Sequence, residues 1–268
     1  MAEKKLRILV TNDDGIRAKG LEVTEAIARA LSDDVWVVAP ENEQSGASHS
    51  LTLTTPLRLR TLGGNRFAVS GTPTDCVMMA SAHLMKDLPP DLVLSGVNSG
   101  INAADDVTYS GTIAGAMEGC ALGIPSIALS QVYNYEDRAD IHWDCAKAHG
   151  AVVVKKLIET GWPKDVLMHV NFPDCRPEEV TGVEVVAQGV RAWQEISIER
   201  RIDMRANPYF WIGFRRERFE AKQGTDLDAL ANNKISVTPL QLNLTDWKVL
   251  QVLKRSVDAD FGKPARTT

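Results

Sequence analysis

Residues 8–20 read "ILVTNDDGIRAKG", and this stretch decides how the rest of the chain is interpreted. The apolar or β-branched run from Ile8 to Thr11 predicts a buried strand, and the adjacent carboxylates of Asp13 and Asp14 follow it. Two like charges side by side repel each other. The pair is therefore either a solvated turn or a group that another charge holds in place.

A strand followed by a helix is the unit that repeats along the chain. Apolar residues at helical spacing predict helices over 20–31, after Thr72 and over 141–159. Short apolar runs predict strands in "DVWVVAP", "DLVLSG", "IPSIALS" and "VLMHVNFP". This alternation is typical of an α/β fold with a doubly wound, mostly parallel sheet.

The pattern changes after Gly182, where the pieces "VEVVAQG", "PYFWIGF" and "ISVTPLQL" are strand-like. We therefore expect the α/β core, which would carry any active site, to span residues 1–182. Residues 183–268 are expected to form a β-rich C-terminal extension and not an independent domain.

Composition and charge exclude several classes of protein. The chain has 268 residues and a net charge of -5, which argues against a surface that coats a nucleic-acid polymer. No apolar run approaches the ~18 residues of a membrane span. The four cysteines are scattered without a C-x-x-C pair, as expected for free thiols in the cytoplasm.

Polar residues gather where three of the predicted strands end. The strand ends lead into "NDDG", "SGASHS" and "GVNSGIN", so Asp13, Asp14, Ser45 and Asn98 are expected to share one crevice. Their oxygens form a hard ligand set that suits Mg²⁺ or Mn²⁺, and a cation converts two repelling charges into two ligands. A lone "DDG" is more often a solvated turn, but the agreement of three strand ends favours a metal site.

The segment "YSGT", from Tyr109 to Thr112, begins a predicted helix whose first residues are small. Free backbone N–H groups at a helix start, with the Ser110 and Thr112 hydroxyls beside them, suit a phosphate group. A metal site next to a phosphate site indicates phosphoryl chemistry.

Six motifs occur in a fixed order and together resemble one known family. They are "ILVTNDDG", "APENEQSGASHSLTL", "GTPTDCV", "DLVLSGVNSGIN", "DDVTYSGTIAGAMEG" and "GTDLDALANNKISVTPL". From about Leu6 to about Leu244 the chain closely resembles the survival protein SurE family, metal-dependent nucleotidases that remove phosphate from nucleoside 5′- or 3′-monophosphates.

The resemblance implies specific roles for eight positions. It implies one divalent cation held by Asp13, Asp14, Ser45 and Asn98, the set that the strand ends also indicate, and a phosphate bound by Asn102, Ser110, Gly111 and Thr112. As a hypothesis, the two aspartates anchor the cation, and one of them takes a proton from the attacking water.

The same resemblance implies a Rossmann-like core and C-terminal segments that two subunits exchange, giving a homodimer or a homotetramer. Some family members also act on short polyphosphate. The chain departs from the family pattern at Glu43 and Gln44, where arginines are frequent, at Ala103–Ala104, where leucine–glycine is usual, and at 205–207. These departures bear on substrate preference and leave the metal set intact.

Two other classes of protein share some of these features. Signalling receiver domains also place an acidic pair after their first strand, but their phospho-acceptor aspartate would stand at the position of Gly96. A non-catalytic nucleotide-binding protein would keep the phosphate site but would not need two carboxylates beside it.

Overall fold

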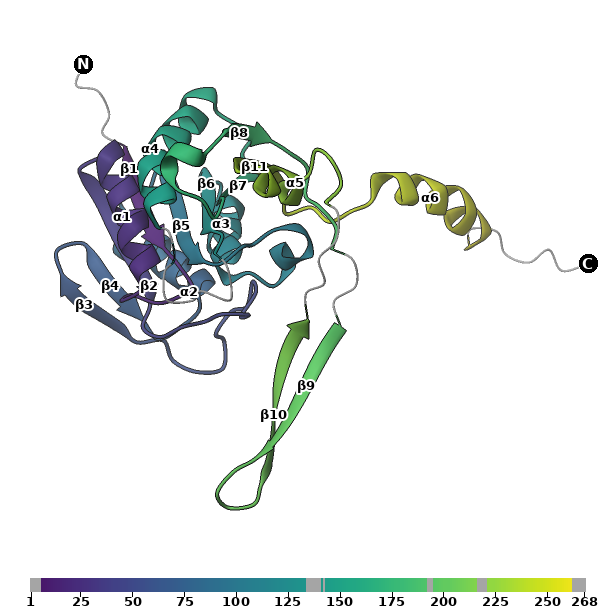
Figure 1. Cartoon of the computed structure of the whole chain (residues 1–268), viewed down its shortest axis with the longest axis horizontal. Helices are drawn as coiled ribbons and strands as arrows, with labels where there is room; N and C mark the ends of the chain where they lie inside the picture. Colours follow the sequence, from purple (N-terminus) through teal and green to yellow (C-terminus); the bar gives the residue numbers. More distant parts are fainter. Residues whose placement is uncertain (1–5, 134–140, 142, 192–194, 216–220, 262–268) are drawn as a thin grey trace, which may run out of the picture.

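A computed structural model describes residues 6–133, 141, 143–191, 195–215 and 221–261. A nine-stranded sheet forms the centre of the molecule (Figure 1). From edge to edge its strands are β3 (Leu59–Gly63), β4 (Arg66–Val69), β2 (Asp34–Pro40), β1 (Arg7–Thr11), β5 (Leu92–Ser99), β6 (Ser126–Gln131), β7 (Val166–Phe172), β11 (Lys234–Gln241) and β8 (Gly182–Val185). The strands from β4 through β7 run parallel, so the α/β, mostly parallel sheet predicted from the sequence is confirmed.

Helices cover both faces of this sheet, which explains why the central strands are continuously apolar. The helices and single turns of the core are α1 (Lys19–Leu31), α2 (Pro73–Met79), η1 (Ala80–Leu84), η2 (Ala104–Thr108), α3 (Gly111–Ala121), α4 (Trp143–Thr160) and η4 (Pro177–Glu179). Ile8 and Val10 of β1 face α1 and α4, whereas Leu9 faces α2. Helix α3 lies on the same side as α2.

Helix α2 begins as its sequence predicts. The Thr72 side chain accepts a hydrogen bond from the backbone N–H of Asp75 at 3.2 Å, and the Asp75 carboxylate accepts one from the N–H of Thr72 at 2.9 Å. Pro73 occupies the first helical position, where its missing N–H costs nothing. The capping box fixes where the chain turns from the β3–β4 hairpin into the helical layer.

Three glycines let α3 approach the sheet closely. Gly111, Gly115 and Gly119 recur every four residues, so they line one face of the helix. A Cβ at Gly115 would lie 2.7 Å from Ser95 Oγ, and a Cβ at Gly119 would lie 2.3 Å from Ser126 Oγ. The absence of side chains along this face brings the first turn of α3 down to the end of β1.

The C-terminal part of the chain is more varied than the β-rich extension that the sequence predicts. Strands β8 and β11 lie within the main sheet, while β9 (Glu195–Ile202) and β10 (Pro208–Arg215) form an antiparallel hairpin that projects from it (Figure 1). Helices α5 (Asp226–Ala231) and α6 (Trp247–Phe261) also belong to this part.

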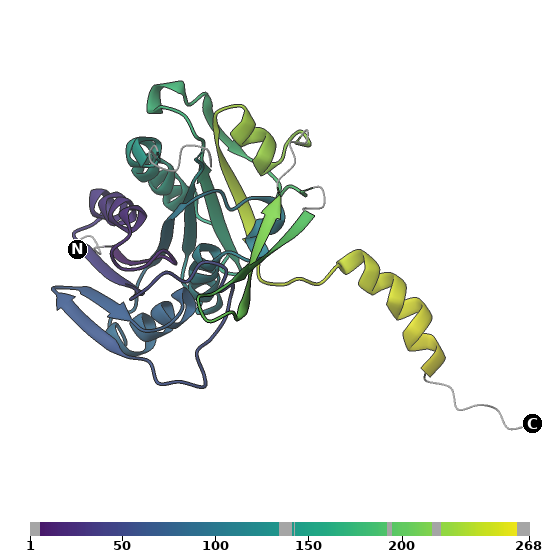
Figure 2. The same cartoon turned by 60° about the horizontal axis from the view of Figure 1, so that its bottom comes forward.

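The sequence reading found few helical signals after Gly182 and so missed α6. Val249, Val252, Leu253 and Val257 are spaced by three or four positions, which is the helical period. The helix extends away from the sheet (Figures 1 and 2). Among the described residues, none of the helices is both long and apolar enough to cross a membrane.

The close approach of α3 predicts that Gly119→Val destabilises the protein. Its Cβ would also lie 2.8 Å from Val93 Cγ2, in a strand that cannot move aside. Overpacking of this kind should lower the free energy of unfolding by roughly 2 kcal/mol, measured by urea denaturation. Ala121→Val, at an exposed position of the same helix, is the control and should cost well under half as much. Equal losses in both variants would contradict the close approach.

Candidate metal and phosphate site

The acid pair lies at the carboxyl end of β1, in the turn that leads to α1. The Asp13 side chain is only 4% exposed, and Asp14 is half-buried. Gly15 follows with a φ of +99°, a conformation that favours glycine, and a Cβ there would lie 3.3 Å from the Asn42 carbonyl carbon. The turn is therefore packed against the loop after β2 and is not a solvated turn.

Burial makes the negative charge of both aspartates unfavourable. Burial, and then the neighbouring charge of Asp14, raises the pKa of Asp13 to about 7. Burial also raises the pKa of Asp14, as does the charge of Glu43, although the Ser99 N–H opposes this by donating to Asp14 Oδ2 at 3.1 Å. Among the residues that the structure describes, no lysine or arginine lowers either pKa.

The start of α3 is built against Asp13. The Thr112 hydroxyl donates to Asp13 Oδ1, and a Cβ at Gly111 would lie 2.8 Å from Asp13 Cβ. Ser110 caps the helix, and its Oγ accepts from the Ile113 N–H at 3.1 Å. The predicted phosphate residues of α3 thus lie next to the predicted metal ligands, and Thr112 is bonded directly to one of them.

Ser45 and Asn98 lie next to residues that are hydrogen-bonded to the acid pair. The Gln44 N–H donates to the Asp13 carbonyl at 2.8 Å, which places the Ser45 loop over the pair. The exposed Ser45 hydroxyl itself donates to Glu43 Oε1 at 2.8 Å. Asn98 precedes the residue that binds Asp14, and its Nδ2 donates to the Gly100 carbonyl at 2.9 Å, so its side-chain carbonyl oxygen remains available as a ligand.

A buried polar network holds Asn102. The Asn102 N–H donates to Asn171 Oδ1 and Asn171 Nδ2 donates to the Asn102 carbonyl, both at 3.2 Å, while Asn102 Nδ2 donates to Ser130 Oγ at 3.1 Å. Burial lowers the pKa of the adjacent His169 to about 3, so that imidazole is neutral. The network therefore fixes Asn102 through neutral groups.

The donor set fits a hard divalent cation. In the described part of the chain, no three side chains of the His, Cys, Asp or Glu type gather into a cluster that would hold a metal. A cation at this edge would therefore bind two carboxylates and neutral oxygens, the environment that Mg²⁺ and Mn²⁺ favour. A buried and a half-buried acid with raised pKa values are also the groups that such a cation would stabilise.

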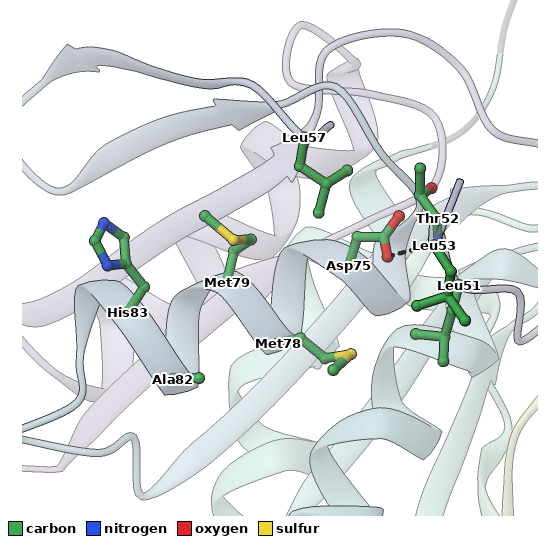
Figure 3. Close-up of a pocket in the computed structure, with 9 residues that line it drawn as sticks. All are labelled: Leu51, Thr52, Leu53, Leu57, Asp75, Met78, Met79, Ala82 and His83. Carbon is green, nitrogen blue, oxygen red and sulfur yellow. Dashed lines mark hydrogen bonds between the residues drawn. The ribbon is translucent and has the colours of Figure 1, made fainter. Parts of the chain in front are cut away.

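A separate apolar hollow of about 260 Å³ lies between the segment after the Ser45 loop and the helices α2 and η1 (Figure 3). Its one acidic side chain, Asp75, already accepts the N–H groups of Thr52 at 3.1 Å and Thr72 at 2.9 Å. The lining residues are Leu51, Thr52, Leu53, Leu57, Asp75, Met78, Met79, Ala82 and His83. This hollow lacks the paired acids that phosphoryl chemistry needs.

The sequence reading missed Ser130, Asn171 and Asp226. Ser130 and Asn171 stand at the carboxyl ends of β6 and β7, so the rule that selected the other strand ends would also have found them. Asp226 comes from the motif "GTDLDAL" far along the chain, and its buried carboxylate accepts the Ala104 N–H at 2.8 Å. No local signal connects Asp226 with the other two positions.

Known proteins resemble this chain over most of its length. The profile of the family described as survival protein SurE matches residues 8–195. A protein of Methylorubrum extorquens (strain PA1) named 5′-nucleotidase SurE is 63% identical over 241 residues, which is 90% of this chain and 95% of that protein. One of the same name from Parvibaculum lavamentivorans is 56% identical over 263 residues, covering 98% and 95%. The crystal structure of the SurE protein from Aquifex aeolicus is 40% identical and matches with a TM-score of 0.80, covering 93% of this chain and 98% of that one.

The raised pKa of Asp13 predicts how the stability of the metal-free protein depends on pH. Between its ordinary value of 3.8 and about 7, the folded protein holds a proton that the unfolded chain has released. The contribution of Asp13 to the free energy of unfolding is therefore fully present below about pH 4 and is lost progressively as the pH rises to about 7, by up to ~4 kcal/mol.

Urea denaturation in a chelator, between about pH 4 and about pH 8, measures this loss. Asp13→Asn should remove most of it and be more stable than the unsubstituted protein at the upper pH. Asp87→Asn, at an exposed acid far from the site, should keep the full loss. Identical pH profiles for Asp13→Asn and the unsubstituted protein would contradict the assignment.

Proposed function

Because the chain belongs to the survival protein SurE family, we propose that it hydrolyses nucleoside 5′-monophosphates to a nucleoside and phosphate. The observation that carries the proposal is the adjacent Asp13–Asp14 pair, whose buried member Asp13 packs directly against the start of α3. Phosphoryl transfer needs concentrated positive charge around the phosphate. A cation held by the two acids would supply this positive charge, and the adjacent helix N-terminus would add to it.

We propose that one Mg²⁺ or Mn²⁺ per subunit is held by Asp13, Asp14, Ser45 and Asn98. Such a cation supplies Lewis-acid chemistry by neutralising charge on the phosphoryl oxygens. The Thr112 hydroxyl fixes Asp13 Oδ1, and the Ser99 N–H fixes Asp14 Oδ2, so neither carboxylate is free to turn away. One of the two carboxylates accepts the proton of the attacking water.

The phosphate group itself is assigned to Asn102, Ser110, Gly111 and Thr112. The positive end of the α3 dipole and the N–H groups of its first turn favour the equatorial oxygens of the transition state. These residues are assigned to the phosphate and not to the base. We therefore propose nucleoside 3′-monophosphates and short polyphosphate as further substrates. The four free, buried cysteines are consistent with the cytoplasm as the place of action.

A receiver-like signalling role is disfavoured by Gly96. The phospho-acceptor of such a domain would stand there, but a Cβ at Gly96 would lie 2.2 Å from the Leu129 carbonyl oxygen, and its φ is +133°. No aspartate fits that position. A non-catalytic nucleotide-binding protein is the remaining alternative, and only turnover separates it from the nucleotidase.

The proposal predicts metal-dependent release of phosphate from AMP. Dialysis against EDTA should abolish the release, and Mg²⁺ or Mn²⁺ should restore it. Asn in place of either aspartate keeps the shape but removes a charge that the cation needs, so Asp13→Asn and Asp14→Asn should each lower kcat/KM by about 10²-fold or more. Asp87→Asn, at an exposed acid, is the matched control and should retain full activity.

Three results would count against this assignment. Undiminished activity in EDTA would refute the metal. Near-normal activity of both aspartate variants would refute the site. Tight AMP binding without turnover, at saturating Mg²⁺ or Mn²⁺, would favour the non-catalytic alternative.

We also propose that the protein is a homodimer or a homotetramer. The projecting β9–β10 hairpin exposes large apolar side chains such as Phe210, Trp211 and Ile212 at 56%, 59% and 69%, and α6 exposes Trp247 at 60% (Figure 1). Monomers seldom leave such surfaces uncovered. Light scattering at micromolar protein should give at least twice the 29.4 kDa of one chain. The mass of a single chain would contradict the proposal.

A further inference from the structure

The loop between β5 and α3 contains a residue in an unfavourable conformation. Ala104 has a φ of +54°, in the left-handed region that alanine rarely adopts, and it is fully buried. It lies two residues after Asn102 and six before Ser110, both assigned to the phosphate. Its conformation therefore decides how the two phosphate residues face each other.

Both polar backbone groups of Ala104 are held by side chains from the C-terminal part of the chain. Its N–H donates to Asp226 Oδ2 at 2.8 Å, and its carbonyl accepts from Gln188 Nε2 at 2.9 Å. Buried backbone groups must be satisfied, and a helix or strand would do so locally. Ala104 is the first residue of η2, and here two residues more than 80 positions away in sequence add hydrogen bonds to it, which compensates for the strained backbone.

The same contacts bind the loop to the chain that enters the projecting hairpin. The other oxygen of Asp226 accepts the Gly189 N–H at 2.9 Å, and a Cβ at Gly189 would lie 2.7 Å from it. Two residues further, Arg191 forms an ion pair with Asp106 at 2.6 Å, with side chains 9% and 19% exposed. Residues 188–191, which we call the hairpin root, thus pack on the phosphate loop.

On its other side the loop is held by the sheet, because Asn171 binds both backbone groups of Asn102. The loop is therefore fixed from two directions, by β7 and by the hairpin root. Loss of either contact would let Ala104 relax to a negative φ and would displace Asn102 relative to Ser110.

We propose that Gln188 and Asp226 are positioning residues that hold the phosphate-binding loop through Ala104, so that the hairpin root controls phosphate affinity. This inference rests on the proposed nucleotidase function, which assigns Asn102 and Ser110 to the phosphate. Neither positioning residue contacts the substrate in this scheme, and neither touches the acid pair.

Gln188→Ala is the decisive variant because Gln188 is exposed, so its truncation should leave the fold intact. Losing one hydrogen bond should raise KM for AMP and the inhibition constant of inorganic phosphate by about two- to tenfold, with kcat nearly unchanged. The Kd for Mn²⁺ should stay the same, since Asp13 and Asp14 are untouched. Gln223→Ala, an exposed glutamine in the chain leading to α5, is the matched control and should change none of these values.

Ala104→Gly should restore the phosphate affinity that Gln188→Ala lowers. A role of Gln188 in overall stability alone would not produce this rescue. Glycine adopts a positive φ without the penalty that alanine meets, so the loop should need less external support. Ala104→Gly combined with Gln188→Ala should return KM and the phosphate inhibition constant to within about twofold of the original values. Asp226→Asn, if it folds, should weaken phosphate binding at least as much as Gln188→Ala.

The outcomes separate this inference from the proposed function. Direct titration of inorganic phosphate by calorimetry measures the affinity without turnover. An inactive parent protein would refute the nucleotidase, while a phosphate affinity lowered by Gln188→Ala would still support the positioning role. An active parent whose KM and phosphate affinity are the same in Gln188→Ala as in Gln223→Ala would overturn the inference, as would a double variant that shows no rescue.

Discussion

The contact between Asp13 and the start of α3 is the constraint on which the rest of the site depends. It exists only because the helix can approach the sheet along Gly111, Gly115 and Gly119, where any side chain would collide with β1, β5 or β6. The Thr112 hydroxyl then reaches Asp13 Oδ1 directly. A bulkier helix would move away from the sheet and separate the acids from the group that fixes them.

That contact buries the Asp13 carboxylate, where a negative charge destabilises the folded protein. Asp13 is almost fully buried and its neighbour Asp14 is half-buried, so desolvation and mutual repulsion both disfavour ionisation. A protein selected only for stability would not retain such a pair. The proposed cation resolves the conflict, because the desolvation that destabilises the free acids strengthens their attraction to a bound metal.

The two halves of the chain supply different parts of the site. The N-terminal half supplies the acids, the Ser45 loop and the first turn of α3, while the C-terminal half supplies the support for the loop between β5 and α3. Asp226 and Gln188 hold Ala104, and Asn171 holds Asn102. Residues remote from the chemistry thus fix the geometry of the groups assigned to it, and the hairpin that exposes apolar surface begins at the same place.

The sequence by itself determined the strand–helix alternation, the mostly parallel sheet, the start of α2 after Thr72 and the position of the acid pair, because these follow from local periodicity and from where a parallel strand ends. Only the tertiary structure decided that β11 joins the main sheet and that Asp226 and Gln188 support Ala104. Those outcomes depend on pairing between segments far apart in the chain, for which no spacing of residues carries a signal. The raised pKa of Asp13 belongs to the same class, since the sequence shows two adjacent acids but only the folded packing shows that water is excluded from one of them.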